Sequence, residues 1–330
     1  MVWLRRTCYF LGLALMSTAV MAQSTVKIAA EENTAKARAQ AQTQALEEII
    51  IRLTGQPNVK EMPGVEGILQ RAENWVDEYS YEEEGDDVFF VFGFDEQQLR
   101  NELAELGAPL WSENRPELVV WWVKQHRDIV SENQADEPAH EALIQQAERR
   151  GVPLRFPRMD SEDRVQVAAS DVRGQFFDHI ARGTENYRTA LALAVVQEND
   201  HRLRWFLLNR DQEMESGTLT AEDEAALGAQ LATQVANVLG QRFAVASGDM
   251  QQLRVVVKGV NSLPQWHQLE TILQGQAGVK LAQLVRLNEE ELQFDVTYAG
   301  DGAQLKQVLL FRSELSSCPE DEGTITLCWY

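Results

Sequence analysis

A short acidic segment in the middle of the chain has the residue types that cation binding or acid–base chemistry needs. Asp160 and Asp163 follow a predicted apolar strand at residues 152–156, and Asp171 opens the helix predicted next. Ligands of α/β sheets bind beyond the carboxyl ends of the strands, so a site is expected here. A pair of carboxylates can hold a divalent cation, or divide acid and base roles when their environments separate their pKa values. His179, two turns along the helix, would add a nitrogen ligand.

The same residues have a structural interpretation, which we favour. Asp160 and Asp163 are typical of turns and helix caps. The negative charge of Asp171 is favourable near the start of a helix. Arg158 and Arg164 would partly neutralise the acids. The segment therefore remains a candidate ligand site, and no residue is predicted to be catalytic.

Two adjacent tryptophans, Trp121 and Trp122, form a second candidate for an interface or a stacking surface. Aromatic side chains are enriched at the hot spots of protein interfaces. However, residues 118–123 form a continuous apolar run, which is typical of a strand buried on both faces. Neighbouring side chains of a strand point to opposite faces, so the core is the favoured position for both rings.

Most established catalytic motifs are absent from the sequence. The chain lacks a G-x-S-x-G elbow, a P-loop, a G-x-G-x-x-G turn after a strand and an H-E-x-x-H helix. The histidines are scattered, which would require long-range convergence to build a multi-histidine metal site; they are His126, His140, His179, His201 and His267. We therefore expect no cofactor and no enzymatic activity, with a carboxylate-dependent hydrolase as the least favoured possibility.

The first 22 residues have the pattern of a secretory signal peptide. Arg5 and Arg6 precede a short apolar stretch, and residues 20–22 form a small-residue cleavage site. Cleavage after Ala22 would deliver a periplasmic protein. The apolar stretch is too short to span a bilayer, which needs about 20 residues, so stable membrane insertion is not expected.

The charge of the chain excludes one class of partner. The 51 acidic residues outnumber the 30 basic ones, for a net charge of −21, and removal of Arg5 and Arg6 makes it more negative. Such a surface repels nucleic acid. The partner expected instead is another envelope protein.

Two cysteines follow the signal segment, Cys318 and Cys328. An even pair in an oxidising compartment predicts a disulfide. A metal site is the weaker alternative, because the nearest histidine is His267.

The periodicity of the chain predicts an α/β (α+β) fold of three small modules. After the signal peptide (1–22) we expect an N-terminal β-α-β-β-α module (23–113), a central three-layer α/β domain (114–248) and a C-terminal β-α-β-β-α module with the disulfide (249–330). Asn33 is expected to cap the first helix. In the central domain, residues 168–182 are expected to form one helix and residues 211–217 a loop.

Several short segments of the chain form a set: Arg52-Leu53-Thr54-Gly55, Gly107-Ala108-Pro109-Leu110-Trp111 before Arg115-Pro116, Val120-Trp121-Trp122, Gly151-Val152-Pro153-Leu154, Pro157 with Asp160 and Asp163, and Asp171. Together they resemble the family known as domain of unknown function 2066, found in exported proteins of gammaproteobacteria. The chain departs from the family at residues 181–188, where Arg-Tyr-Gly is expected. The family has no established activity. The central domain is also similar, more distantly, to nucleotide-free α/β domains of the Tol-Pal propeller protein and the curli-secretion lipoprotein, which implies protein–protein contact.

The leading hypothesis is therefore a non-enzymatic periplasmic adaptor or envelope assembly factor that acts by protein–protein contact. The alternative is a protein that binds a small ligand or a divalent cation through the acidic segment after Phe156.

Overall fold

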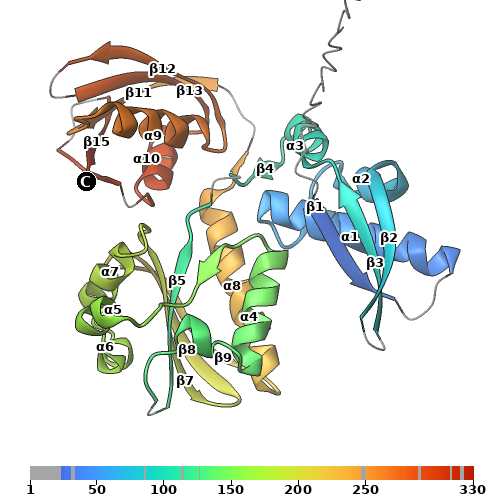
Figure 1. The fold of residues 1–330 in the computed structure, drawn as a ribbon. Helices are drawn as coiled ribbons and strands as arrows, with labels where there is room; N and C mark the ends of the chain where they lie inside the picture. The colour runs from blue at the N-terminus through green and yellow to red at the C-terminus, as the bar shows by residue number, and fades with distance from the viewer. Residues whose placement is uncertain are drawn as a thin grey trace, which may run out of the picture.

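The computed structural model describes residues 24–30, 34–84, 87–112, 115–125, 127–246, 250–288, 291–312, 314–319 and 323–330. The predicted signal peptide, Asn33 and His126 lie outside these residues. The fold is mixed α/β, as predicted. The described strands form four sheets, of which the three larger ones each organise one unit of the chain (Figure 1). None of the described helices combines the length and apolar character needed to cross a membrane.

The N-terminal unit packs helices against a three-stranded antiparallel sheet in the order β1-β3-β2. Its elements are β1 (Ser24–Ala29), α1 (Ala35–Thr54), a 3-10 turn (Val59–Glu61), α2 (Val65–Leu69), a 3-10 turn (Ala72–Asn74), β2 (Val76–Glu84), β3 (Asp87–Phe94) and α3 (Glu96–Glu105). Thr34 caps α1 by accepting from the amide of Ala37 at 3.1 Å. The helix ends at Gly55, whose left-handed backbone suits glycine.

The central unit is built on a five-stranded sheet in the order β6-β5-β7-β8-β9. Its elements are β5 (Leu118–Lys124), a 3-10 turn (Glu132–Gln134), α4 (Pro138–Arg149), β6 (Leu154–Arg155), α5 (Ser161–Gln166), α6 (Ala169–Gly174), α7 (Phe177–Glu185), β7 (Leu191–Asn199), β8 (Arg202–Asn209), β9 (Gln212–Thr220) and α8 (Glu224–Phe243). Strands β6, β5 and β7 are parallel, and β8 and β9 extend the sheet antiparallel.

Helices cover both faces of this sheet (Figure 1). One face packs against α4 and α8, and the other against the short helices α5 to α7. Strand β5 is buried on both faces, as its apolar run predicts. The central unit therefore has the three layers expected from the sequence.

Three local expectations for the central unit were wrong. The strand at residues 152–156 is reduced to Leu154–Arg155. The helix expected at residues 168–182 is two helices, because Gln175 adopts a left-handed backbone (φ 61°) after the weak helix former Gly174. The loop expected at 211–217 is part of β9, an edge strand whose exposed, polar side chains hide its pairing with β8.

The C-terminal unit is a second five-stranded sheet, in the order β12-β13-β11-β15-β14, with α9 and α10 against it. Its elements are β11 (Met250–Lys258), α9 (Leu263–Gln274), β12 (Val279–Leu287), β13 (Glu291–Ala299), α10 (Gly302–Leu309), β14 (Leu315–Ser317) and β15 (Ile325–Trp329). The expected β-α-β-β-α order is present, and β15 adds a strand parallel to β11.

Short contacts join the three units. The two-residue strands β4 (Pro109–Leu110) and β10 (Val245–Ala246) pair antiparallel, and the amide of Trp111 donates to Leu53 O at 2.8 Å. Towards the C-terminal unit, the rings of Phe243 and Phe311 meet edge to face at 4.3 Å.

Candidate functional site

Asp160 caps a helix rather than lying in a loop. The acidic segment forms α5, and Asp160 accepts from the amides of Glu162 (3.0 Å) and Asp163 (3.1 Å). These backbone donors, chiefly that of Asp163, lower the pKa of the Asp160 carboxyl despite some desolvation. Arg158 pairs with its other oxygen at 3.4 Å. The carboxylate is thus used to start the helix.

Asp163 is fully buried, at 0 % exposure. Its Oδ2 accepts from the amide of Met159 at 2.9 Å and from the hydroxyl of Tyr187. The amide of Arg158 in turn donates to the Tyr187 hydroxyl at 2.8 Å. Burial first, and the hydrogen bond to Asp163 second, raise the pKa of Tyr187 to about 12. Asp163 therefore ties the turn after β6 to the end of α7.

Asp171 lies on a different helix and has a different role. It accepts from the amide of Ala168 at 2.8 Å at the start of α6, and it lies 3.2 Å from His179 Nδ1. Within the described residues, no three His, Cys, Asp or Glu side chains are grouped so that they could hold a metal ion. Asp160 and Asp171 therefore cap helices, and Asp163 makes buried hydrogen bonds.

Trp121 and Trp122 are both fully buried and lie on opposite faces of β5. Trp121 Nε1 donates to Thr184 Oγ1 at 2.9 Å on the α7 side. Trp122 Nε1 donates to Gln197 Oε1 at 3.0 Å on the α8 side. Each indole N–H has a partner, as a buried tryptophan requires. Neither ring is displayed to solvent.

At the carboxyl end of β5, Lys124 fills the position where α/β sheets place ligands. It contacts Glu224, Glu137 (3.2 Å) and Asp200 (3.5 Å). Desolvation alone would lower the pKa of Lys124, but the hydrogen bonds to Glu224 and Glu137 outweigh it and raise the pKa. The ammonium therefore stays charged and unsuited to act as a nucleophile.

His140 lies beside this ion-pair cluster with 1 % exposure. Its ring meets Trp122 edge to face at 4.8 Å and Phe156 at 5.4 Å. Neither ring nitrogen has a hydrogen-bond partner among the described residues. Burial lowers the pKa of His140, although Glu137 opposes the shift. The imidazole is a packed core group here.

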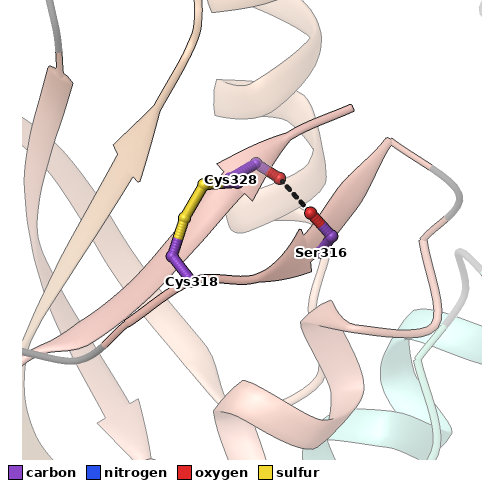
Figure 2. The surroundings of a disulfide bond; sticks show 3 residues. All are labelled: Ser316, Cys318 and Cys328. Atoms are coloured by element: carbon purple, nitrogen blue, oxygen red, sulfur yellow. Dashed lines mark hydrogen bonds between the residues drawn. A yellow bond between two sulfur atoms is a disulfide. The ribbon is translucent and has the colours of Figure 1, made fainter.

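The predicted disulfide is present in the C-terminal unit. Cys318, just after β14, is bonded to Cys328 on β15, with their Cα atoms 5.6 Å apart. Ser316 Oγ donates to Cys328 O at 3.4 Å beside it (Figure 2). The bond fastens the last two strands, so it is a structural staple.

An apolar pocket that the sequence did not indicate lies at one end of the C-terminal unit. It has a volume of about 420 Å³, between the start of α9 and the turn after β12. Leu263 and Leu287 flank it and are 69 % and 70 % exposed. Trp266 forms part of the wall, and its Nε1 is buried without a partner among the described residues. We call this the Leu263–Leu287 pocket.

The sequence does not predict this pocket, because its walls come from separate segments. In the most aromatic part of the sequence, the hairpin of β2 and β3, Phe90, Phe92 and Phe94 are buried. A usable signal was present: Leu263 and Leu287 each adjoin a polar turn at the end of an element.

Comparison with known proteins places only the N-terminal part of the chain. Residues 20–112 match the family described as Domain of unknown function (DUF8605). The resemblance to domain of unknown function 2066 was therefore wrong, since the matching family is a different one and ends at residue 112. The segments behind that resemblance are at most five residues long, which is too short to define a family. No curated protein and no solved structure matches the chain.

Proposed function

We propose that the protein is a non-enzymatic adaptor or assembly factor of the bacterial envelope, acting in the periplasm by protein–protein contact. The observation that carries the proposal is the Leu263–Leu287 pocket, where two large apolar side chains stand in solvent around a cavity. Apolar patches that are rimmed by polar residues mark interaction sites. The predicted signal peptide supports the compartment.

The strand next to the pocket offers a second contact. Among the described strands, β12 pairs with β13 alone and forms one edge of its sheet (Figure 1). Leu281 and Val285 on this nine-residue strand are about half exposed, and Leu287 ends it. A long apolar edge strand is a template for an added strand from another chain. The pocket and the β12 edge together form the docking surface that we propose.

The charge of β12 indicates what docks there. The strand carries Lys280 and Arg286 and no acidic residue, although the chain has a net charge of −21. An extended segment of another envelope protein, with apolar and acidic residues, would complement it. Its apolar side chain would enter the pocket. A second copy of the chain fits less well, because two strongly acidic surfaces repel each other.

The acidic segment after Phe156 is not assigned a ligand. Asp160 caps α5, and Asp163 is enclosed by Met159 and Tyr187. Displaying either carboxylate to a cation would open the turn that they hold.

The test is site-specific photocrosslinking in cells, followed by mass spectrometry. A photoreactive residue at Leu263 or at Leu287 is expected to capture one dominant envelope protein, and the same probe at Val165, an 84 % exposed apolar position on α5, is not. Leu287→Glu is expected to abolish the Leu263 crosslink, because a carboxylate at the pocket rim repels an acidic segment. Equal capture at all three positions, or capture that Leu287→Glu leaves intact, would overturn the docking surface.

A further inference from the structure

A large cavity lies where the N-terminal and central units meet. It has a volume of about 600 Å³ and is lined from the end of α1, the start of α3, the linker at Arg115 and the turn after α4. This is the size of pocket that holds a small organic molecule. We call it the junction pocket.

Three arginines converge on the junction pocket: Arg52, Arg100 and Arg115. Two carboxylates, Glu96 and Glu148, also line it, so the cations are in excess. Arg52 pairs with Glu96 at 2.8 Å, and Arg100 Nη1 donates to Trp111 O at 2.9 Å. A local excess of positive charge stands out on a chain with 51 acidic and 30 basic residues.

Arg115 is rigidly held at the back of the pocket. Its guanidinium donates to four backbone carbonyls, those of Ser112 (3.0 Å), Arg150 (3.1 Å), Gly151 (2.6 Å) and Arg52 (2.5 Å). It also stacks on the Trp111 ring at 3.9 Å. These bonds use four of its five N–H groups, so Arg115 would attract an anion mainly through its fixed charge.

The positive charges of the three arginines repel one another. Burial first, and then the charges of Arg100 and Arg52, lower the pKa of Arg115 to about 9, with Glu96 opposing them. An anion in the pocket would offset this repulsion. Beside the arginines, the apolar lining is the exposed Pro153, together with Leu53 and Val152, which are almost fully buried.

We propose that the junction pocket binds a small organic anion, with one carboxylate or phosphate group at the arginines and an apolar body against Pro153. Planar guanidinium groups suit both oxyanions. The apolar wall favours a ligand with a hydrocarbon part over a bare ion. Because the pocket is formed by both units, its ligand would also hold them together.

A second cavity continues from the junction pocket and supports the assignment. It has a volume of about 470 Å³ and shares Arg52 and Glu148 with the first. Lys27 and Arg149 add positive charge to its lining, and Glu48 adds a carboxylate, so basic side chains are again in slight excess.

Binding is tested on the full mature chain by isothermal titration calorimetry. The probes are decanoate, decyl phosphate and inorganic phosphate, with decanol as the uncharged control. Decanoate or decyl phosphate is expected to bind, and decanol is not. Their relative affinities decide between the two oxyanions, and inorganic phosphate isolates the contribution of the charge. Failure of both charged amphiphiles to bind at millimolar concentration would overturn the proposal.

Variants locate the binding in the pocket. Glu148→Gln removes a negative charge from the lining, so affinity is expected to rise about threefold, because Glu148 is exposed and solvent screens its charge. Arg52→Gln is expected to lower it by a similar factor. Glu141→Gln, on the exposed side of the same helix, is the matched control and should change nothing. A variant that binds more tightly cannot owe that gain to misfolding. Equal affinity of Glu148→Gln and Glu141→Gln would show that the probes do not bind in the junction pocket.

Discussion

Gly55 and Gly240 lie backbone against backbone, with no room for a side chain on either. A Cβ on Gly55 would stand 2.6 Å from the Cα of Gly240, and a Cβ on Gly240 would stand 2.2 Å from the carbonyl oxygen of Gly55. Gly55 follows α1 of the N-terminal unit, and Gly240 lies in α8 of the central unit. The two units thus touch through the main chain, next to the junction pocket.

Gly240→Ala is expected to destabilise the protein by about 1–3 kcal/mol, the cost of overpacking a tight contact. The backbone of Gly55 cannot move aside, because it closes α1 with a left-handed turn. Urea unfolding followed by circular dichroism measures the change. Gly67→Ala in α2 is the control, since a Cβ there meets nothing within 4 Å and should leave stability unchanged or slightly higher. Equal stability of both variants would show that the contact is not tight in solution.

Arg115→Lys is expected to lower the free energy of unfolding by about 2–4 kcal/mol, although the charge is kept. An ammonium cannot reach Ser112 O, Gly151 O and Arg52 O together, as the guanidinium fork does. Urea unfolding again provides the measurement. Arg204→Lys is matched in chemistry but lies in a surface ion pair with Glu198, and it should cost less than about 0.5 kcal/mol. Similar losses in the two variants would contradict the role given to Arg115.

Periodicity and turn chemistry predicted the elements that have a clear apolar pattern. Strand β5, the three layers around it and the Cys318–Cys328 bond follow from apolar runs and cysteine count. Strand β9 was missed because an edge strand needs few apolar residues. The break at Gln175 was missed because a left-handed backbone at a non-glycine residue depends on its tertiary surroundings.

For the candidate site residues too, local contacts could be predicted from the sequence and long-range contacts could not. Capping by Asp160 is local, since its partners are two and three residues away, and the sequence indicated it. The bond between Asp163 and Tyr187 spans 24 residues and had no local signal. Arg115 donates to carbonyls from three segments, and a carbonyl leaves no trace in the sequence. Contacts to the main chain across units are therefore visible only in the folded structure.

His140 gives the protein an acid-sensitive core. Because burial lowers its pKa in the folded state, the unfolded chain binds a proton more readily once the pH falls below about 6.5. The contribution of His140 to the free energy of unfolding is fully present above that pH. Below it the contribution falls by up to about 1.4 kcal/mol per pH unit, until the pKa of the folded state is reached. The charges that face the ring are those of Glu137, Lys124, Glu224 and Asp136.

His140→Phe keeps the aromatic packing against Trp122 and Phe156 but removes the titrating group. We expect the variant to be at least as stable as the parent at pH 7, because both ring nitrogens of the histidine are buried without partners among the described residues. Between pH 6.5 and 5 its stability should fall less steeply, as measured by urea unfolding at each pH. His201→Phe, in the exposed turn between β7 and β8, should keep the slope of the parent. Parallel slopes for His140→Phe and the parent would mean that His140 takes up its proton without unfolding.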